Sequence, residues 1–471
     1  MPTTTHDSTT TPVGEIPGIV QRVRQGATDG LLRTRDQREA QLRALRRFLV
    51  ECEDELVTAL RDDLGKPPIE AYSTEIGFTI GEIDHIVSKL ARWMKPTRVK
   101  VPLKLRPGRA RLVPQPLGTV LVIAPWNYPV QLVLAPLAAA LAAGNTVVLK
   151  PSEVAPATAE VLARRLGDYL DPRLVAVVTG AVPETTALLE ERFDHIFYTG
   201  NGTVGRVVMR AAAEHLTPVT LELGGKSPAI VTAPTDVEVA ARRIAWGKFV
   251  NAGQTCVAPD HVLVDRELEA PLVGAIVAAV HRFYGDDPAA SPDYARIVNE
   301  RHHDRLVGLL DAGGFDEVAL GGEHDRDRRY LAPTVLRGVA PDAAVMDGEI
   351  FGPILPVIAV DDLDAAIAHV NAGPAPLALY AFTDDEELQE RVVAETSAGG
   401  VTLNHTLLHL AVDGLPFGGV GESGMGAYHG KAGFDVFTHH KPVLAKRLKP
   451  DPALLYPPYP KWKQRILRRA L

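Results

Sequence analysis

Cysteine is scarce in this sequence of 471 residues, and neither a dominant charge nor a membrane-length apolar run is present. The only cysteines, Cys52 and Cys256, are too few for a disulfide framework, so we expect free thiols in a reducing compartment. Lys and Arg total 50 against 58 Asp and Glu, which argues against a nucleic-acid partner. The most apolar stretch, residues 130–143, contains a glutamine and a proline, so we expect a buried helix there and no transmembrane segment.

The two ends of the chain differ from the rest. Residues 1–12 are polar and threonine-rich and lack the apolar segment of a secretory signal, so we expect a disordered tail and a cytoplasmic protein. Residues 461–471 carry five basic side chains among eleven, with Trp462 and Ile466 four residues apart. Two interpretations of this basic tail are open, namely a short helix on an anionic membrane surface and a solvated or protein-packed tail.

The composition, with 46% hydrophobic and 23% charged residues, is typical of a soluble globular protein of two or three domains. Between residues 118 and 223, short β-branched runs alternate with stretches of helical periodicity, which predicts a parallel sheet with crossover helices. A second alternation over residues 228–284 predicts a second α/β lobe. The expected strands of the first sheet are 119–125, 145–150, 175–180, 195–200 and 219–223. The regions 20–64 and 73–94 are expected to be helical. Residues 106–117 and 449–460 are candidate linkers.

Cys256 is a candidate nucleophile, because it follows a helix that is expected to end at residues 252–253 and stands where a substrate could reach it. A free cysteine is more often inert packing, which is the interpretation kept for Cys52. Glu222 ends an apolar strand, where burial would raise its pKa toward that of a general base, and a solvated strand end is the alternative. A thiol and a water-activating carboxylate are together the groups needed to form and hydrolyse a thioester.

Polar residues follow other predicted strands, at the edge where open α/β sheets bind ligands. Asn127 could donate to an oxyanion or simply form a turn, and Lys150 with Glu153 could bind a nucleotide ribose or form a surface cap. The segment GNGTVG, residues 200–205, follows a strand and opens a helix, and it spells the G-x-G-x-x-G pattern of dinucleotide binding. In a standard dinucleotide-binding fold, the acid that binds the ribose stands about 20 residues after this loop, which here would be Glu222. Glu222 cannot both bind the ribose and act as the general base.

Several segments, read in order, resemble the signatures of the NAD(P)-dependent aldehyde dehydrogenase superfamily. They are PWNYP (125–129), LKPSE (149–153), YTGNGTVG (198–205), LELGGKSP (221–228), NAGQTC (251–256), EIFGP (349–353) and LPFGGVGESGMG (415–426). Finer detail, including RRIAWGKF (242–249) and GMGAYHG (424–430), resembles the class 3 branch, which includes enzymes for fatty, aromatic and coniferyl-type aldehydes. The resemblance extends from about residue 24 to residue 459.

The resemblance implies a role for each matching residue. Cys256 would be the nucleophile and Glu222 the general base, and Asn127 would form the oxyanion hole with the backbone N–H of Cys256, which resolves the double assignment of Glu222 in favour of catalysis. The implied cofactor-binding residues are Lys150 and Glu153 at the adenosine ribose, Gly200, Asn201, Gly202, Thr203, Val204 and Gly205 near the pyrophosphate, and Glu349 and Phe351 at the nicotinamide. The expected substrate-pocket residues are Tyr128, His405, Leu407 and His409, and no metal ion is expected.

The implied fold is α/β, with a Rossmann-like cofactor-binding lobe, a second α/β catalytic lobe and a small bridging element. Residues 13–99 and 118–223 would form the cofactor-binding domain and residues 224–438 the catalytic domain. Residues 100–117 and 439–460 would form the bridging segments of a homodimer, followed by the basic tail.

The implied reaction is oxidation of an aldehyde, aliphatic or aromatic, to the free acid through a thiohemiacetal and a thioester on Cys256, with water rather than phosphate or CoA as the acceptor. NAD is the expected cofactor, because Glu153 would repel the 2′-phosphate of NADP, and NADP is expected to be tolerated as in other members of this branch. Two residues depart from the family pattern: Gly202, which makes the match to the dinucleotide fingerprint partly accidental, and His405, which replaces an acid often found there. The alternatives are a non-catalytic binding or structural descendant and a thiol esterase side activity.

Overall fold

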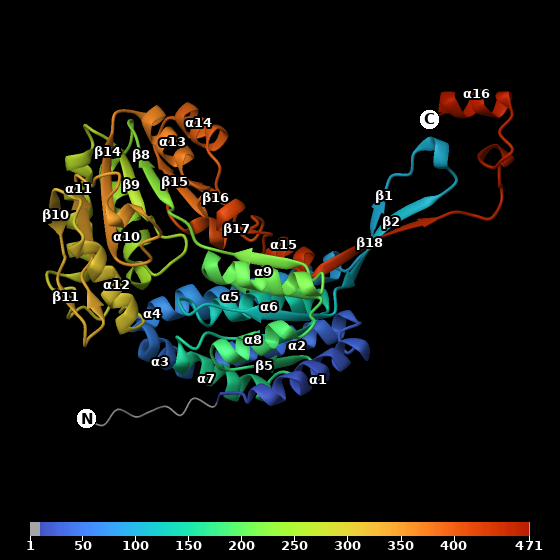
Figure 1. Cartoon of the computed structure of the whole chain (residues 1–471), viewed down its shortest axis with the longest axis horizontal. Coiled ribbons are helices and arrows are strands. Elements are labelled where there is room, and N and C mark those ends of the chain that lie inside the picture. The colour runs from blue at the N-terminus through green and yellow to red at the C-terminus, as the bar shows by residue number, and fades with distance from the viewer. Residues whose placement is uncertain (1–9, 471) are drawn as a thin grey trace.

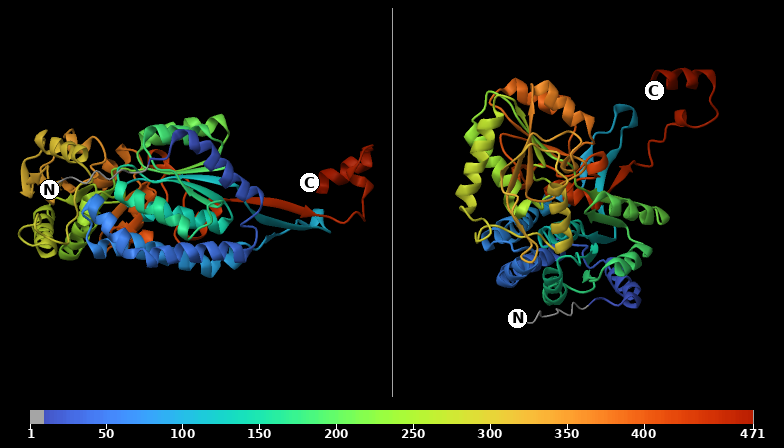
Figure 2. Two further views of the ribbon diagram at one scale, coloured as in Figure 1. Left: turned by 90° about the horizontal axis from the view of Figure 1, so that it is seen from below. Right: turned by 60° about the vertical axis from the view of Figure 1, so that its left-hand side comes forward.

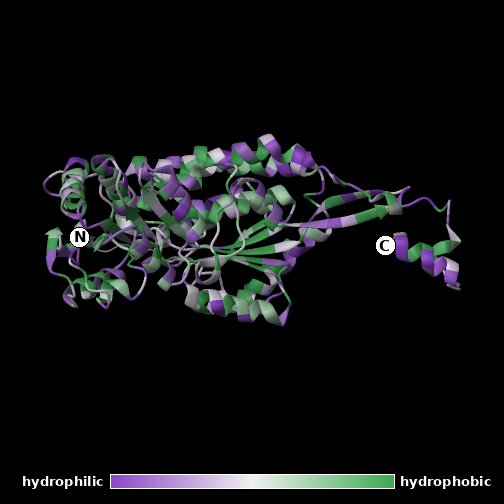
Figure 3. Ribbon diagram, turned by 90° about the horizontal axis from the view of Figure 1, so that it is seen from above, coloured by the Kyte–Doolittle hydropathy of each residue, from purple (hydrophilic) through white to green (hydrophobic). Residues whose placement is uncertain are grey.

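Two α/β lobes and a projecting arm make up the protein in this computed structural model, which describes residues 10–470 (Figure 1). The first lobe lies at the bottom of Figure 1, the second at the upper left, and the arm extends to the right and ends in a short helix. Figure 3 shows apolar residues concentrated in the strands and inner helices, with polar residues on the outer helical faces and on the C-terminal helix.

The first lobe is built on a six-stranded sheet with the order β17-β7-β6-β3-β4-β5. Its strands are β3 (Thr119–Ile123), β4 (Thr146–Lys150), β5 (Val175–Val177), β6 (His195–Thr199), β7 (Val219–Glu222) and β17 (Gly424–Met425), all parallel except β17. The five predicted strands are confirmed; β4 ends at Lys150 as expected, and the other four end one to three residues earlier than expected. The strand order reverses between β3 and β6, which is the switch point where doubly wound sheets bind dinucleotides.

Helices cover both faces of this sheet. Helix α6 (Gln131–Ala143) is buried along its whole length, because it lies between the sheet and other helices and is apolar all round. The other helices of this lobe are α1 (Ile16–Thr28), α2 (Arg35–Glu51), α3 (Glu53–Leu64), α4 (Pro68–Ala71), α5 (Gly77–Trp93), α7 (Pro156–Arg165), α8 (Val182–Glu190), α9 (Gly202–Glu214) and α15 (Gly430–Val436). The region predicted to be helical over residues 20–64 is therefore divided among α1, α2 and α3.

The second lobe contains a seven-stranded sheet with the order β10-β13-β14-β9-β8-β15-β16, parallel except for the β10–β13 pair. Its strands are β8 (Pro228–Val231), β9 (His261–Asp265), β10 (Glu317–Leu320), β13 (Thr334–Arg337), β14 (Ile354–Val360), β15 (Ala378–Phe382) and β16 (Gly400–Leu403). Its helices are α10 (Val237–Phe249), α11 (Glu269–Tyr284), α12 (Glu300–Asp311), α13 (Leu363–Ala372) and α14 (Glu386–Glu395), with a small hairpin of β11 (His324–Asp325) and β12 (Tyr330–Leu331). The predicted second α/β lobe is thus confirmed.

The arm is a three-stranded antiparallel sheet with the order β1-β2-β18. Its strands are β1 (Thr97–Val99), β2 (Arg109–Pro116) and β18 (Thr438–Ala445), and the chain continues to α16 (Lys461–Ala470). Both views of Figure 2 show the arm standing clear of the two lobes. The proposed linker over residues 106–117 is therefore mostly a strand, since β2 pairs along its whole length with β18.

Three of the expected domain limits need correction. Residues 424–436 leave the second lobe, because β17 pairs with β7 and α15 packs on α5 and α6 of the first lobe. Strand β1 belongs to the arm rather than to the first lobe. Of the expected disordered tail, residues 1–9 lie outside the described residues, whereas the backbone N–H of Thr11 donates to the carbonyl oxygen of Thr179 at 3.1 Å. Among residues 10–470, none of the helices has the length and apolar character needed to cross a lipid bilayer.

Candidate active site

The sequence-predicted catalytic residues come from both lobes and meet at the carboxyl ends of the first sheet. Asn127 follows β3, and Glu222 is the last residue of β7. Cys256 comes from the second lobe, in the segment between α10 and β9. The site therefore lies where the two lobes face each other, at the switch point of the first sheet.

The loop that carries Cys256 has an unusual backbone. Helix α10 ends at Phe249, earlier than predicted, and Asn251, Ala252 and Gly253 all have positive φ values of 52°, 50° and 72°. A Cβ atom on Gly253 would lie 2.3 Å from the carbonyl oxygen of Gly352, so only glycine permits this approach. This close backbone contact holds the EIFGP loop against the cysteine loop.

Gln254 fixes the cysteine loop from inside. Its side chain is fully buried and donates to the carbonyl oxygens of Asn251 and Arg296, both at 3.0 Å, while its own amide oxygen accepts from the backbone N–H of Val298 at 2.9 Å. The side-chain amide of Asn127 donates to the backbone carbonyl of Gln254 at 3.0 Å. The candidate oxyanion donor is thus hydrogen bonded to the loop that carries the thiol.

Burial dominates the electrostatics at Cys256, whose side chain is half-buried. The buried surroundings raise the pKa of the thiol, and the nearby carboxylates of Glu349 and Glu222 raise it further. The thiol is therefore the stable form in this site, and its proton has to leave when the sulfur attacks. Glu349 is the stronger of the two electrostatic neighbours, a relationship that the sequence did not indicate.

Glu222 is a buried carboxyl group without a hydrogen bond among the described residues. Its side chain is 2% exposed, and neither carboxylate oxygen has a partner there. Desolvation raises the pKa of Glu222 well above its usual value. An unpaired buried carboxyl costs stability, and such groups are concentrated at functional sites.

Glu349 lies beside the two glycines that follow β7. Its carboxylate accepts from the backbone N–H of Gly225, and one of its oxygens occupies the space where a side chain at Gly224 would stand. Burial raises the pKa of Glu349 to about 8. Cys256, Glu222 and Glu349 thus form one cluster.

The predicted ribose-binding pair is formed at the end of β4. Lys150 is 2% exposed, and its ammonium donates to the carbonyl oxygen of Pro151 at 2.9 Å and to Glu153 at 3.2 Å. Burial lowers the pKa of Lys150. Because an ammonium has three donors, one remains for a ligand hydroxyl.

A cavity of about 190 Å³ lies next to this pair, lined in part by Glu153, Thr179, Gly180 and Ala181. The loop after β6 leads into α9, and Asn201 caps this helix by accepting from the backbone N–H of Val204 at 3.0 Å. In the same loop, the backbone N–H of Gly200 donates to the carbonyl oxygen of Glu222 at 3.0 Å. These groups suit an adenosine diphosphate: Lys150 has a donor free for a hydroxyl, Glu153 can accept from the ribose, and the N-terminus of α9 can face the phosphates. The residues therefore fit a nicotinamide dinucleotide. A larger cavity of about 430 Å³ between α3 and α7 is lined by none of the predicted site residues.

Comparisons with known proteins match residues 20–443 to the Aldehyde dehydrogenase family. The chain belongs to this family. It is 50% identical over 441 residues to aldehyde dehydrogenase family 3 member A2 of Mus musculus, covering 93% of this chain and 90% of that protein. It is 46% identical to a Rattus norvegicus protein named "Aldehyde dehydrogenase, dimeric NADP-preferring", covering 95% and 99%.

A solved structure described as the substrate-bound state of Staphylococcus aureus AldH superimposes with a TM-score of 0.93 at 43% identity, covering 96% of this chain and 99% of that one. These similarities confirm the class 3 resemblance and the α/β fold with a Rossmann-like lobe. The chain is an NAD(P)-dependent aldehyde dehydrogenase, which oxidises an aldehyde to the acid.

The predicted nicotinamide side of the dehydrogenase site combines residues from both lobes. The ring of Phe351, whose φ is 48°, packs edge-on against Trp126 with centroids 5.3 Å apart. Trp126 immediately precedes Asn127, and its other neighbour is the ring of His302 at 4.9 Å. This aromatic contact places the predicted nicotinamide residue Phe351 next to the candidate oxyanion donor.

The four predicted pocket residues of the enzyme have different surroundings. Tyr128 is 9% exposed and its hydroxyl is hydrogen bonded to Thr255 at 2.6 Å, so it faces the interior behind the cysteine loop. Leu407 is buried in the core. His409 is hydrogen bonded to Thr402 at 2.8 Å, and His405 packs edge-on against Trp246 with centroids 5.8 Å apart.

Two tyrosines near the thiol of the dehydrogenase were missed by the sequence analysis. Tyr380, on β15, is fully buried, donates to the carbonyl oxygen of Val257 at 2.5 Å and lies within electrostatic range of Cys256. Tyr428 is within electrostatic range of both Glu222 and Cys256. Tyr428 is part of the quoted GMGAYHG segment, which was its only signal, and Tyr380 looked like an ordinary core strand residue.

Proposed function

We propose that this aldehyde dehydrogenase acts on medium- or long-chain aliphatic or aromatic aldehydes and releases the free acid, with Cys256, Glu222 and Asn127 as its catalytic residues. The observation that carries the proposal is the buried carboxyl group of Glu222, which has no hydrogen-bond partner among residues 10–470 and lies within electrostatic range of Cys256. Cys256 packs against the main buried apolar cluster of the protein, and such surroundings favour an apolar substrate.

Attack by the Cys256 sulfur on the carbonyl carbon forms a carbon–sulfur bond, breaks the S–H bond with its proton passing to water, and leaves negative charge on the carbonyl oxygen. The side-chain amide of Asn127 and the backbone N–H of Cys256 donate to this oxygen, and one such donor is typically worth about 2.7–4 kcal/mol in the transition state. When bound, the nicotinamide ring supplies the hydride acceptor that the oxidation requires. Lys150, Glu153, Glu349 and Phe351 would hold the cofactor, as the sequence predicts.

Glu222 completes the reaction at the thioester on Cys256. Its carboxylate removes a proton from water, the resulting hydroxide adds to the thioester carbon, and the carbon–sulfur bond breaks to release the acid and the Cys256 thiolate, which takes up the proton held by Glu222. Burial makes this carboxylate a stronger base, because it raises the pKa of Glu222. A base that activates water favours hydrolysis over transfer to phosphate or CoA.

NAD is the proposed preferred cofactor, with NADP tolerated. The carboxylate of Glu153 lies at the candidate ribose cavity, where it would accept a hydrogen bond from the 2′-hydroxyl and repel a 2′-phosphate. Its side chain is 45% exposed, which weakens the repulsion. The name of the rat relative, NADP-preferring, supports the tolerance.

A homodimer formed through the arm is also proposed. The arm stands clear of the lobes and exposes apolar side chains, including Leu444 at 55% and Leu103 at 80%. The rat relative is named as dimeric. Light scattering is expected to give about twice the mass of the 50.7 kDa chain, and a monomer at micromolar concentration would contradict this assignment.

A cytoplasmic location stays part of the proposal, supported by the free thiols of Cys52 and Cys256. Residues 461–470 form the short helix expected for a membrane-surface segment. Contact of this helix with a membrane stays a prediction.

The experiment that tests the proposed function follows reduced cofactor at 340 nm with aldehydes from short aliphatic to long-chain and cinnamyl-type, in the native enzyme, Cys256→Ala and Glu222→Gln. We expect no turnover in Cys256→Ala, and one burst of reduced cofactor followed by stalled turnover in Glu222→Gln. Full steady-state turnover in Glu222→Gln would assign the base elsewhere, with Glu349→Gln as the next variant. Turnover only of an ester, without cofactor, would favour the esterase alternative.

A further inference from the structure

A buried ion pair lies directly behind the loop that carries Asn127. Lys66, just after α3, and Glu75, in the π-helical turn 72–76 after α4, pair at 2.5 Å, and both side chains are 0% exposed. Removing two charges from water costs several kcal/mol per ion unless the pair is well hydrogen bonded. A buried pair of this kind therefore indicates a demand for a defined geometry, and its remaining contacts show where that geometry is needed.

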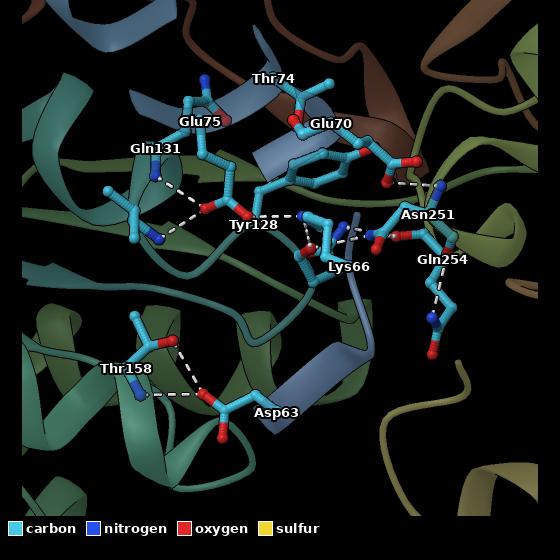
Figure 4. Close-up of polar contacts among 12 residues, drawn as sticks. Asp63, Lys66, Glu70, Thr74, Glu75, Tyr128, Gln131, Thr158, Asn251 and Gln254 are labelled. Carbon is cyan, nitrogen blue, oxygen red and sulfur yellow. Dashed lines mark hydrogen bonds and ion pairs between the residues drawn. The ribbon is translucent and has the colours of Figure 1, made fainter. Parts of the chain in front are cut away.

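Both partners contact the segment that links β3 to α6. The ammonium of Lys66 donates to the backbone carbonyl of Asn127 at 3.3 Å and lies 4.1 Å from the ring centroid of Tyr128. The second carboxylate oxygen of Glu75 accepts from the backbone N–H groups of Val130 at 2.8 Å and Gln131 at 3.3 Å. The pair thus holds this segment at both ends, as Figure 4 shows for Lys66, Glu75, Tyr128 and Gln131.

The same carbonyl oxygen of Asn127 also receives a bond from the cysteine loop. The side-chain amide of Asn251 donates to it at 2.8 Å, and the amide of Asn127 in turn donates to the carbonyl of Gln254. Figure 4 shows Asn251 and Gln254 beside Lys66. The main chain at Asn127 is therefore held between the N-terminal helices and the cysteine loop.

We propose that Lys66 and Glu75 are positioning residues, which act through the backbone at Asn127 to aim its amide at the oxyanion. This inference rests on the proposed oxyanion role of Asn127. Neither residue is expected to touch the aldehyde or the cofactor, because both are completely buried behind the loop. An error of about 1 Å in such a donor is enough to lower the rate strongly.

The test is a double-mutant cycle in which one arm is the paired change Lys66→Met/Glu75→Gln and the other is Asn127→Ala. The partner change Glu75→Gln accompanies Lys66→Met, so that both charges of the pair are removed with side-chain volume kept; this double variant is called the charge-free pair. We expect the charge-free pair to lower kcat by roughly tenfold to a hundredfold, less than the ~10²–10³ expected for loss of the donor itself. In the Asn127→Ala background the same pair of changes should cost little further, because a residue that acts through Asn127 has nothing left to position.

Two readouts separate positioning from general damage. Alkylation of Cys256 by iodoacetamide forms no oxyanion, so its rate should stay within about twofold of native in the charge-free pair, and the dissociation constant for NADH should not change. Asp63→Asn is the matched control, since Asp63 is a buried carboxyl near the end of α3 that accepts from the backbone N–H of Thr158 at 2.8 Å, away from Asn127. It is expected to lower the melting temperature without lowering kcat at saturating cofactor.

The outcomes distinguish the inference from the proposal beneath it. Equal losses of kcat in the native and Asn127→Ala backgrounds would overturn the positioning role while leaving the oxyanion role intact. Parallel loss of iodoacetamide reactivity would also overturn it, because the thiol itself would then be disturbed. An unchanged kcat in Asn127→Ala would overturn the oxyanion role, and the positioning role with it.

Discussion

The side-chain amide of Asn127 donates to the carbonyl oxygen of Gln254, two residues before Cys256, at a distance of 3.0 Å. A primary amide has two N–H donors, so one bond fixes the orientation of the group and the other is free for a substrate oxygen. The hydrogen bond therefore couples the donor to the nucleophile loop. Relative movement of the two lobes would separate the donor from the thiol.

Asn127→Ala is expected to lower kcat by about 10²–10³, the range found for removal of one oxyanion donor. Steady-state rates at saturating aldehyde and NAD measure this effect, and the affinity for NADH should remain native. Asn371→Ala is the matched control, because the amide of Asn371 also donates to a backbone carbonyl, that of Glu395 at 2.8 Å, in an outer helix pair. A loss of less than fivefold in Asn127→Ala would remove this residue from the oxyanion hole.

Much of this site could be predicted because its residues stand at strand ends. Glu222, Asn127 and Lys150 follow short apolar runs whose parallel order brings their carboxyl ends to one edge, and the structure has all three there. The backbone conformation of the cysteine loop could not be predicted, since a positive φ at Asn251 and Ala252 has no local sequence signal. The helix was accordingly expected to continue about three residues too far.

The contacts behind the site could not be predicted, because they join distant segments. Lys66 stands beside two prolines in a short turn and resembles a surface lysine, yet it contacts Asn127, 61 residues away. Only the packing of α3 and α4 against the β3–α6 connection brings these residues together. The strand pairing within the arm had no local signal either, since β2 contains two prolines and pairs with β18 more than 300 residues later. Its segments, residues 100–117 and 439–460, were expected from the family resemblance alone.

Gly253→Ala is expected to disrupt the cysteine loop. The φ of 72° costs a residue with a side chain roughly 1–2 kcal/mol, and the new Cβ atom would lie 2.3 Å from the carbonyl oxygen of Gly352. We expect a lower melting temperature together with a loss of both activity and burst amplitude. Gly274→Ala is the control, because this glycine lies in α11 with no atom near its side-chain position, and alanine there should be neutral or stabilising. Native activity in Gly253→Ala would show that the loop tolerates a different backbone path.

Glu153→Gln is expected to shift cofactor preference toward NADP. Removing one charge about 4 Å from a 2′-phosphate is worth roughly 1–4 kcal/mol in a partly solvated site, so the ratio of kcat/KM for NADP to that for NAD should rise by about tenfold or more. The KM for the aldehyde should not change, since Glu153 lines the candidate ribose cavity, whose lining includes none of Cys256, Glu222 and Asn127. An unchanged ratio would mean that this carboxylate does not face the 2′ position.

Glu349 is expected to make folding stability depend on pH. Its pKa is raised by burial from 4.5 to about 8, so between these values the unfolded carboxyl loses its proton while the folded one keeps it. The contribution of this group to stability is therefore complete below pH 4.5 and is lost as the pH rises toward 8, by about 1.4 kcal/mol per pH unit at most.

Glu349→Gln removes the titration. The melting temperature of this variant should exceed that of the native protein by a margin that grows from pH 5 to pH 8, and Glu222→Gln should show the same direction because burial also raises the pKa of Glu222. A margin that stays constant, or that shrinks as the pH rises, would show that Glu349 is already ionised in the folded enzyme at low pH, paired with a cation such as Lys248 that lies within its electrostatic range.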